Sequence, residues 1–507
     1  MNAPLVSLSR LLHDLDDLKI DAKPLQPHFV MRCDTHVRER YAGLLAAILL
    51  AQGKVDEAQS RLFCLLLGSL GLSGSQARLF EQAPSTDRTV LSECARFFGE
   101  QGLMLTFFVD AAILLRLAGP LSAESQQLLC ELADFFGLSP TDLAFAADLA
   151  AIVLCMEPTQ DIPPEFDYGR VSAWEEFLYR TLTAERLMSG PLRGMWKIAA
   201  PMTLTSGWTL EGARLRFEGE GRVLTEMTEE GKVQIADGYL ENPLMRFAGK
   251  VSVEITNTKI YGEYPEGARC TAIAIIPEKR TYEAAGYTLR SDSVKLSGLE
   301  VCTRNARSFL IQEVSELSYH RYGMRFEVND CHFSNCGNRY LNGGAIAICA
   351  HSGEGFNESN VTIKKSKFEK CQARFGGGVF VVDGLKFSGV VDSIFESCAS
   401  FAYNSPGSVE DFAFGGGAIF AHSLHPGESS ACIINCIFKN TSLQAGYSHE
   451  GSRNVDPVYG CEFDNSFLAY TGGSYAPGRS CTFSNKQRDF NGPIKIEKEE
   501  QSWWSEY

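Results

Sequence analysis

Two histidines and a carboxylate that could do acid–base or metal chemistry follow three similar stretches of the sequence. His351, Asp383 and His422 each come shortly after an apolar run that begins with two or three glycines. If those runs lie side by side, the three side chains share one edge, where imidazole and carboxylate groups can bind a metal or transfer protons. The competing explanation is that polar residues end strands and line turns, and we favour it because no further motif accompanies the three residues.

The sequence lacks the motifs by which common enzyme classes are recognised. It contains no phosphate-binding GxxxxGK[ST] loop, no GxSxG nucleophile elbow and no HExxH helix. The paired aspartates with nearby Gly-His-Gly and Arg-x-Lys segments of pectin-cleaving enzymes are also missing. The sixteen cysteines show no Cys-x-x-Cys pair and no zinc-ligand spacing. We therefore expect them to be small apolar core residues, and we expect no metal and no cofactor.

Two further groups of residues are candidates for binding a partner. Glu410 and Asp411 lie in a long insertion, and long loops on a rigid scaffold often bind other molecules. Trp503 and Trp504 lie in an acidic C-terminal segment, where paired tryptophans suit a docking peptide. The same tryptophans could instead cover the open end of a stack of strands, which otherwise leaves unpaired strand edges.

Length, composition and charge narrow the possible functions. A chain of 507 residues is too long for one ordinary core, and 45% hydrophobic with 21% charged residues describes a soluble globular protein of several domains. The net charge of −15 disfavours general nucleic-acid binding, which needs surplus Lys and Arg. The aspartates of residues 1–20 are unlike a signal peptide, and the most apolar stretch, 102–117, is too short to span a bilayer. We therefore expect a cytoplasmic protein with no transmembrane segment.

Residues 40–156 have the periodicity of helices and contain an internal repeat. Apolar residues recur at spacings of three and four, and the segment around Ala46 returns 66 residues later around Ala112. Each copy predicts a helix, a short turn, a second helix and a closing Gly-Leu-Ser. The predicted caps of these helices are Asp56 with Gln59, Ser122, Gly71, Gly137, Ser73 and Ser139.

Three segments of this region, AAILLAQGKVDEAQSRLF (46–63), FFVDAAILLRLAGPLSAESQQLL (107–129) and GLSPTDL (137–143), resemble the TerB-like (tellurite-resistance) helical family. The resemblance implies a helical interaction module of bacterial stress or phage-defence systems. In that family the turn between the helices usually reads Ala-Asp-Gly, and its acidic residues have been linked to metal binding. Here the position of that Asp holds Gln52 in one copy and Ala118 in the other. We therefore do not extend the resemblance to a metal site.

A linker follows the helical region. Residues 157–193 open with the segment PTQDIPPEF, whose prolines prevent a helix from continuing. Residues 171–188 then place Val171, Trp174 and Phe177 on one face and predict a single amphipathic helix. This helix can cover the first turn of the next domain or pack on the helical domain, and the sequence does not decide between them.

Residues 194–490 switch to the two-residue spacing of strands. Their segments align on a repeated Ser/Cys-x-Phe signature, with small residues also three positions after each anchor, as at Cys336 after Phe333. The loops between these rungs vary in length while the rungs do not, which is typical of a stack of equivalent strands. The anchors, the last large apolar residue of each rung, are Ile260, Val301, Phe333, Phe368, Phe395, Phe438, Phe463 and Phe483. The sequence therefore predicts a right-handed parallel β-helix.

A second, glycine-led strand is predicted after three of the rungs, in GGAIAI (343–348), GGGVFV (376–381) and GGGAIF (415–420). Glycines suit a corner where the backbone bends tightly and no Cβ fits. With Phe-x-Asn segments such as 333–335, these strands loosely resemble the GGAI and FxxN repeats of chlamydial polymorphic outer-membrane proteins, over about residues 325–490. The resemblance implies β-helix architecture and nothing about export.

The sequence therefore predicts a multidomain protein, with an all-α domain followed by a right-handed parallel β-helix. We favour a non-enzymatic recognition protein of the cytoplasm, whose β-helix binds a protein partner and whose helical domain is a docking module. A role in bacterial stress or antiviral defence depends on the TerB-like resemblance. The alternative is a carbohydrate-active lyase or hydrolase built on the β-helix, and fold alone does not decide function. The predicted parts are an N-terminal segment (1–39), a TerB-like domain (40–156), a linker with a helix (157–193), a β-helix (194–490) and an acidic tail (491–507).

Overall fold

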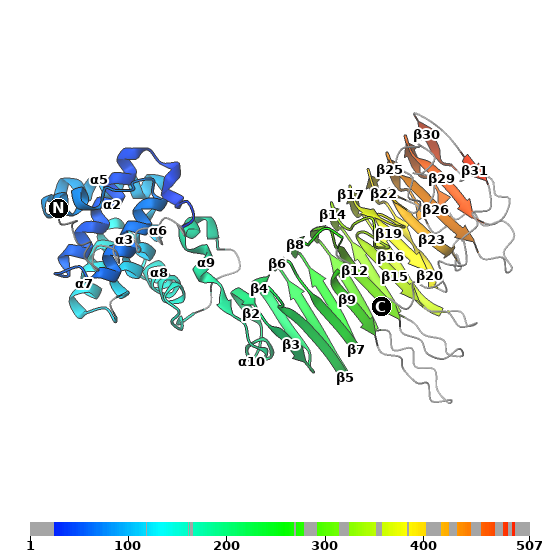
Figure 1. The fold of residues 1–507 in the computed structure, drawn as a ribbon, viewed down its shortest axis with the longest axis horizontal. Helices are drawn as coiled ribbons and strands as arrows, with labels where there is room; N and C mark the ends of the chain where they lie inside the picture. The colour runs from blue at the N-terminus through cyan, green and yellow to red at the C-terminus, as the bar shows by residue number, and fades with distance from the viewer. Residues whose placement is uncertain are drawn as a thin grey trace, which may run out of the picture. The chain divides into compact units, whose positions relative to one another are not determined.

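The structure is a computed structural model in which the chain forms two compact units, Met1–Arg180 and Thr181–Tyr507. The first unit is helical, and the second consists mostly of strands (Figure 1). The structure describes residues 25–117, 119–160, 162, 166–267, 270–277, 292–313, 324–350, 357–382, 385–401, 417–424, 433–447, 458–471, 480–484 and 489–491.

Buried aromatic side chains hold the helical unit together. The rings of Tyr41, Phe98, Phe107 and Phe136 contact one another at centroid distances between 5.0 and 6.0 Å. Each of these rings is nearly inaccessible to solvent, so they form one core to which four helices contribute. The elements of this unit are η1 (Phe29–Arg32), α2 (Thr35–Ala51), α3 (Glu57–Ser69), α4 (Gln76–Gln82), η2 (Ala83–Ser85), α5 (Arg88–Gln101), α6 (Met104–Arg116), α7 (Ala123–Phe136), α8 (Pro140–Val153), η3 (Tyr168–Trp174) and α9 (Glu175–Leu178).

The predicted repeat appears as two similar series of helices, α2 to α4 and α6 to α8. Asp56 and Gln59 form the predicted capping box at the start of α3, and Ser122 caps α7 in the equivalent place. Gly71 and Gly137 adopt left-handed backbone, with φ of 67° and 75°. The predicted cap at Ser139 is confirmed for α8.

The predicted cap at Ser73 is wrong. Gly74 also has a left-handed backbone, with φ of 75°, so the chain turns once more before α4 begins at Gln76. Ser75 therefore takes the N-cap position of α4, without a side-chain hydrogen bond.

Residues 171–188 do not form the single helix that their apolar spacing predicts. They are divided among η3, α9, the two-residue strand β1 (Arg180–Thr181) and α10 (Ala184–Met188). The backbone of Val171 is non-helical, with φ of −122° and ψ of 30°, and Tyr179 is extended, so helical hydrogen bonds are interrupted twice.

Among the residues that the structure describes, no single helix is long and apolar enough to cross a membrane. Only α5 and α6 taken together reach the required length and composition, and the axes of these two helices are bent by 120°.

Apart from one separate two-stranded sheet, the strands of the second unit form a large sheet in which each strand pairs with the next equivalent strand of the chain, and the pairings from β2 onward are parallel. Figure 1 shows the strands following one another in chain order. The strands are β2 (Leu192–Ile198), β3 (Pro201–Leu204), β4 (Trp208–Phe217), β5 (Arg222–Ala236), β6 (Tyr239–Glu241), β7 (Met245–Thr256), β8 (Lys259–Glu263), β9 (Thr271–Pro277), β10 (Asp292–Ser297), β11 (Glu300–Arg304), β12 (Arg307–Glu313), β13 (Met324–Asn329), β14 (His332–Ser334), β15 (Ile346–Ala350), β16 (Asn357–Lys364), β17 (Lys367–Glu369), β18 (Gln372–Ala373), β19 (Val379–Val382), β20 (Leu385–Val391), β21 (Ile394–Glu396), β22 (Ala399–Ser400), β23 (Ile419–Leu424), β24 (Ile433–Ile434), β25 (Ile437–Lys439), β26 (Ser442–Tyr447), β27 (Val458–Tyr459), β28 (Glu462–Asp464), β29 (Phe467–Thr471), β30 (Thr482–Ser484) and β31 (Asp489–Asn491).

The pairings group most of these strands into three series, which we call ladders. The first ladder is β7, β10, β13, β16, β20, β24 and β27. The second is β6, β8, β11, β14, β17, β21, β25, β28 and β30. The third is β9, β12, β15, β19, β23, β26, β29 and β31.

The register of the second ladder confirms the predicted alignment of the rungs. Phe333, Phe368, Phe395, Phe438 and Phe463 pair in that order as Cα neighbours. Their buried rings stack nearly parallel, with centroids 4.7–5.3 Å apart. This spacing matches the distance between neighbouring strands, so the phenylalanines form a continuous core column.

A set of residues with left-handed backbone turns the chain after the anchors of the second ladder. Two positions after the phenylalanine anchors, φ lies between 47° and 54° at Asn335, Lys370, Ser397, Asn440 and Asn465. Asparagine tolerates this conformation better than most residues, which explains the recurring Phe-x-Asn.

The predicted glycine corner is confirmed just before three strands of the third ladder, β15, β19 and β23. A Cβ on Gly344 would lie 2.4 Å from the carbonyl oxygen of Gly377, and a Cβ on Gly377 would lie 2.5 Å from that of Gly417. The glycine-led strands β15, β19 and β23 pair in register just beyond this corner, so the backbones approach too closely for any other residue.

Candidate functional site

The side chains that the sequence singled out lie in parts of the chain for which the structure gives no description. The backbone of His422 lies in β23, but its side chain is outside the described residues. The other candidates, all outside the described residues, are His351, Asp383, Glu410, Asp411, Trp503 and Trp504. Both the proposed metal or acid–base cluster and the proposed binding loops therefore stay predictions.

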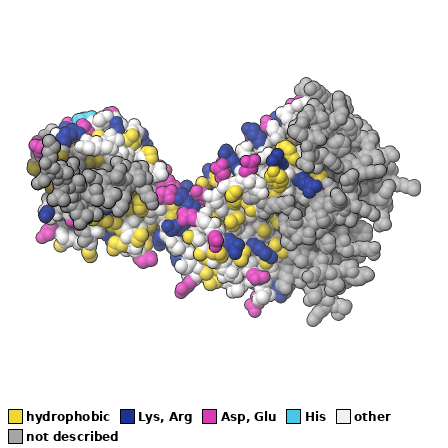
Figure 2. All heavy atoms as spheres, in the orientation of Figure 1, with side chains coloured by type: hydrophobic (Ala, Val, Ile, Leu, Met, Phe, Trp, Pro, Cys, Tyr) yellow, Lys and Arg dark blue, Asp and Glu magenta, His cyan; other side chains and the backbone are white. Residues whose placement is uncertain are grey.

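The described residues instead bring charged side chains together on the outer side of the second ladder. The five stacked anchor phenylalanines point inward, so the residues before and after each of them point outward, as His332 and Ser334 do around Phe333. Figure 2 shows acidic and basic side chains interspersed on the visible face of the described strands. We name the following set the polar outer face: Tyr239, Glu241, Lys259, Tyr261, Glu300, His332, Lys367, Glu369 and Glu396.

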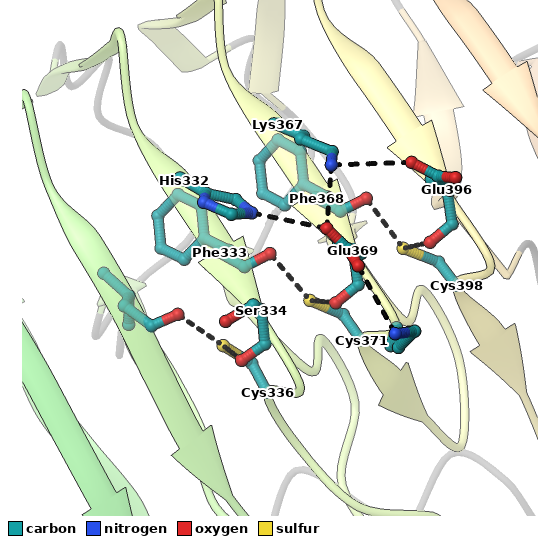
Figure 3. A network of polar contacts seen from close by, with 12 residues as sticks. His332, Phe333, Ser334, Cys336, Lys367, Phe368, Glu369, Cys371, Glu396 and Cys398 are labelled. Atoms are coloured by element: carbon teal, nitrogen blue, oxygen red, sulfur yellow. Dashed lines mark hydrogen bonds and ion pairs between the residues drawn. The ribbon is translucent and has the colours of Figure 1, made fainter.

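Glu369 is the centre of the network on this face (Figure 3). Its Oε2 atom lies 3.6 Å from Nε2 of His332 and 2.7 Å from Nζ of Lys367. The same Lys367 nitrogen lies 3.5 Å from Oε2 of Glu396, and Nζ of Lys370 lies 3.4 Å from Oε1 of Glu369. The hydrogen bond from Lys367 is the main reason that the pKa of Glu369 lies below its usual range, and Glu369 in turn raises the pKa of Lys367.

A second network lies on earlier strands of the same face. The Tyr261 hydroxyl donates a hydrogen bond to Glu300, and Nζ of Lys259 lies 3.1 Å from the other carboxylate oxygen of Glu300. Those two contacts lower the pKa of Glu300, while burial and then the Glu300 contact raise the pKa of Tyr261. The ring of Tyr239 stacks on that of Tyr261 at 5.7 Å, which fixes the position of the phenol.

Buried thiols support the strands behind the Glu369 network. Sγ of Cys336 donates to the carbonyl oxygen of Val301 at 3.6 Å, and Sγ of Cys371 donates to that of Phe333 at 3.7 Å. Cys398 repeats the arrangement one strand further, and Figure 3 shows the three thiols aligned. Burial raises the pKa of the Cys336 and Cys371 thiols well above the ordinary value. The Cys336 and Cys371 thiols are therefore protonated packing groups, as predicted for this column, and not nucleophiles.

The chemistry that the polar outer face can perform is recognition through charged hydrogen bonds. His332 and Glu369 keep 45% and 25% of their side-chain surface exposed, so a bound molecule can reach both of them. Parallel strands hold successive side chains at a fixed spacing of about 4.8 Å, so donors and acceptors of both signs form a rigid array. Within the described ranges, no three His, Cys, Asp or Glu side chains lie together as metal ligands.

Sequence reasoning did not find the polar outer face, although a signal was present. The charged residues lie immediately before and after the same phenylalanines that revealed the rungs, as Lys367 and Glu369 do around Phe368. Aligning the rungs on Phe therefore also aligns their outward neighbours, and this alignment could have identified the array.

A buried carboxylate in the helical unit was also missed. Asp110 is fully inaccessible to solvent and accepts hydrogen bonds from His28 Nε2 at 2.9 Å, Tyr41 Oη at 2.7 Å and Trp174 Nε1 at 2.6 Å. Nδ1 of His28 accepts from the backbone N–H of Val30 at 3.1 Å, so Nε2 carries the proton and a neutral imidazole donates to Asp110. This cluster, which we call the Asp110 network, fastens residues from both ends of the unit to α6.

Comparisons with known proteins gave no match: no family model, no curated protein and no solved structure corresponds to this chain. The two family resemblances drawn from the sequence therefore stay predictions.

Proposed function

We propose that the three ladders are the faces of a right-handed parallel β-helix and that the protein is a non-enzymatic recognition protein. In this proposal the polar outer face binds a protein partner, and the helical unit is a docking module. The main observation that supports this proposal is the Glu369 network. In it, His332, Lys367 and Glu396 surround one carboxylate on a rigid, partly exposed array of strands. Such an array presents both signs of charge at fixed spacing, which favours a partner with complementary charges over a uniformly charged polymer.

The strand arrangement supports the β-helix in this proposal. Within the ladders, each strand pairs in parallel with an equivalent strand two to four elements further along the chain, and the buried phenylalanine column repeats from β14 to β28. Parallel strands need crossover connections, and crossovers in one sheet are almost always right-handed.

Quantitative recovery of partners from the native host tests the recognition function. The tagged full-length chain and a Lys367→Gln/Glu369→Gln double variant are purified, and bound proteins are measured by mass spectrometry. We expect at least about a tenfold loss of the partner, because charge-assisted hydrogen bonds contribute about 1.5–3 kcal/mol each.

A matched control comes from strands outside the second ladder. Lys232 and Glu254 form a similar ion pair on β5 and β7, so Lys232→Gln/Glu254→Gln makes the same changes elsewhere on the strands. Recovery of the same partner at the same level with both double variants would show that the polar outer face is not the binding surface. If no partner is recovered with the wild type, the recognition function itself is wrong.

We further propose a role in bacterial stress or antiviral defence, in the cytoplasm, supported by the TerB-like resemblance of residues 46–63 and 107–129. Plating of a phage panel on strains with and without the gene, and survival under chemical stress, test this role. Equal plating and equal survival of the two strains would contradict it.

A further inference from the structure

The helical unit contains a cavity beside the helices of its first repeat. The cavity has a volume of about 420 Å³ and lies between α2, α4, η2 and the start of α5. His36, Arg40 and Leu44 line it from α2, and Arg78 lines it from α4. Three of these four side chains are basic or can become so, and Glu39, which also lines the cavity, is paired with Arg78.

The internal repeat shows how the equivalent helix face is used elsewhere in the same unit. The offset of 66 residues makes Arg40 and Leu44 of α2 equivalent to Thr106 and Asp110 of α6. On α6 the chain's own η3 covers these positions, because Thr106 Oγ1 donates to the carbonyl oxygen of Arg170 at 2.9 Å and Asp110 accepts from Trp174. Both contacts are four residues apart on each element, so η3 runs alongside α6. On α2 the same two positions face the cavity instead.

The polar groups of the cavity indicate what would fill it. Nε of Arg40 is buried and has no hydrogen-bond partner among the described residues, which leaves a donor in need of an acceptor. Its Nη2 lies 3.0 Å from Glu93, and Arg78 lies 2.7 Å from Glu39. These ion pairs are at least one-third exposed and therefore weak, so a ligand carboxylate can join or replace them at little cost.

We infer that this cavity is the docking site for an acidic peptide segment of a protein partner, bound alongside α2 as η3 is bound alongside α6. A carboxylate of the segment accepts from Arg40, and an apolar side chain four residues later packs on Leu44, which is buried at the cavity wall. Arg78 provides a second donor for the acidic segment. This inference deepens the docking role of the helical unit and rests on the proposed function.

A peptide based on η3 tests the inference directly. Residues 166–176 read FDYGRVSAWEE, and the probe carries the changes Arg170→Glu and Trp174→Leu, which supply the carboxylate and the apolar side chain. Fluorescence anisotropy measures binding of the labelled probe to the full-length chain. We expect saturable binding that Arg40→Gln weakens at least about tenfold, as loss of one charge-assisted hydrogen bond requires.

The controls separate docking from general charge effects. Lys54→Gln removes one positive charge from the α2–α3 turn, outside the cavity, and is expected to leave binding unchanged. The unmodified peptide FDYGRVSAWEE lacks the added carboxylate and leucine and is expected to bind at least about tenfold more weakly. Circular dichroism melting of each variant shows whether the helical unit is intact.

Three results would overturn the inference: no binding of the acidic probe, equal binding of both peptides, or unchanged binding to the folded Arg40→Gln variant. Binding of a peptide of residues 494–507 in the same Arg40-dependent way would overturn the assignment to a different protein and identify a second copy of this chain as the occupant. A negative result in the peptide-binding experiment does not contradict the proposed function of the polar outer face, because the Lys367→Gln/Glu369→Gln variant tests that surface separately.

Discussion

The indole nitrogen of Trp174 lies 2.6 Å from Oδ1 of Asp110, and both side chains are buried. The two residues are 64 positions apart in the sequence, and the intervening helices α7 and α8 separate them along the chain. This hydrogen bond fixes η3 on α6. In the second copy of the repeat, a segment of the chain itself therefore covers the helix face of α6.

Asp110→Ala is expected to destabilise the helical unit by at least about 3 kcal/mol, because three buried donors lose their acceptor at about 1–3 kcal/mol each. The free energy of unfolding in urea, followed by hydrogen exchange of α6 and η3, measures the loss. Tyr41→Phe removes one of the three donors and is expected to cost only about 1–2 kcal/mol. Equal stability of wild type and Asp110→Ala would show that the Asp110 network contributes nothing.

Lys370→Gly is expected to raise the free energy of unfolding of the strand unit by roughly 0.5 kcal/mol. Lys370 has φ of 51°, and this backbone costs about 1–2 kcal/mol for a residue with a Cβ, against about 0.5–1 kcal/mol of extra unfolded-state entropy for glycine. Its ion pair with Glu369 is on the surface and contributes little.

Lys364→Gly removes the same side chain from the extended end of β16 and is the matched control. There the glycine gains nothing in the folded state and is expected to lower stability by about 0.5–1 kcal/mol. Chemical denaturation of both variants measures this difference. If both substitutions changed the free energy of unfolding in the same direction, the conclusion that the left-handed backbone of Lys370 is strained would be wrong.

The cysteines are expected to react with iodoacetamide at pH 8 in two distinct classes. Cys130 and Cys155 are exposed and should be alkylated in the native protein. Burial raises the pKa of Cys331 to about 11, and hydrogen bonding with Cys436 is the main factor raising that of Cys461 to about 12, so both stay protonated and unreactive. Peptide mass spectrometry before and after unfolding measures the labelling. Rapid native labelling of Cys331 or Cys461 would contradict the packed column.

The polar outer face is expected to lose part of its stabilising effect in acid. The folded-state pKa values of Glu300 and Glu369 lie below the value of about 4.3 for unfolded glutamate, so their contribution is present above that pH. It is lost as the pH falls through the lowered folded-state pKa. The difference in unfolding midpoint between wild type and Glu369→Gln should therefore shrink between pH 6 and pH 3. Ser334→Ala, on the same ladder, removes no titrating group and should show a difference that does not change with pH.

Much of the strand register could be predicted from the sequence, because a buried stack requires the same residue types at equivalent positions of successive strands. Phe333, Phe368 and Phe395 occupy one column, and only a small residue fits two positions earlier, so the signature repeats whatever the loop length. The glycine corner and the cap at Asp56 were predictable for the same reason, since each depends on a local backbone shape that few residues adopt.

Features that depend on distant partners could not be predicted. The amphipathic spacing of residues 171–188 indicated one helix, but Trp174 turns to Asp110 and residues 180–181 pair as a strand, and these tertiary contacts override local preference. The contact between His332 and Glu369 likewise depends on the pairing of β14 with β17. The two residues are 37 positions apart in the sequence, and no local pattern indicates that their side chains meet.

The alternation of inward and outward residues has a consequence for how this protein can vary. The residues that hold the strands together, such as Phe368, and those displayed beside them, such as Lys367 and Glu369, are neighbours in sequence but on opposite sides of the backbone. Replacing a displayed side chain changes no interior contact, while a rung with altered outer residues still fits its neighbours. Substitutions on the outer side of one rung can therefore change the surface chemistry of the protein while the buried contacts that determine its fold stay the same.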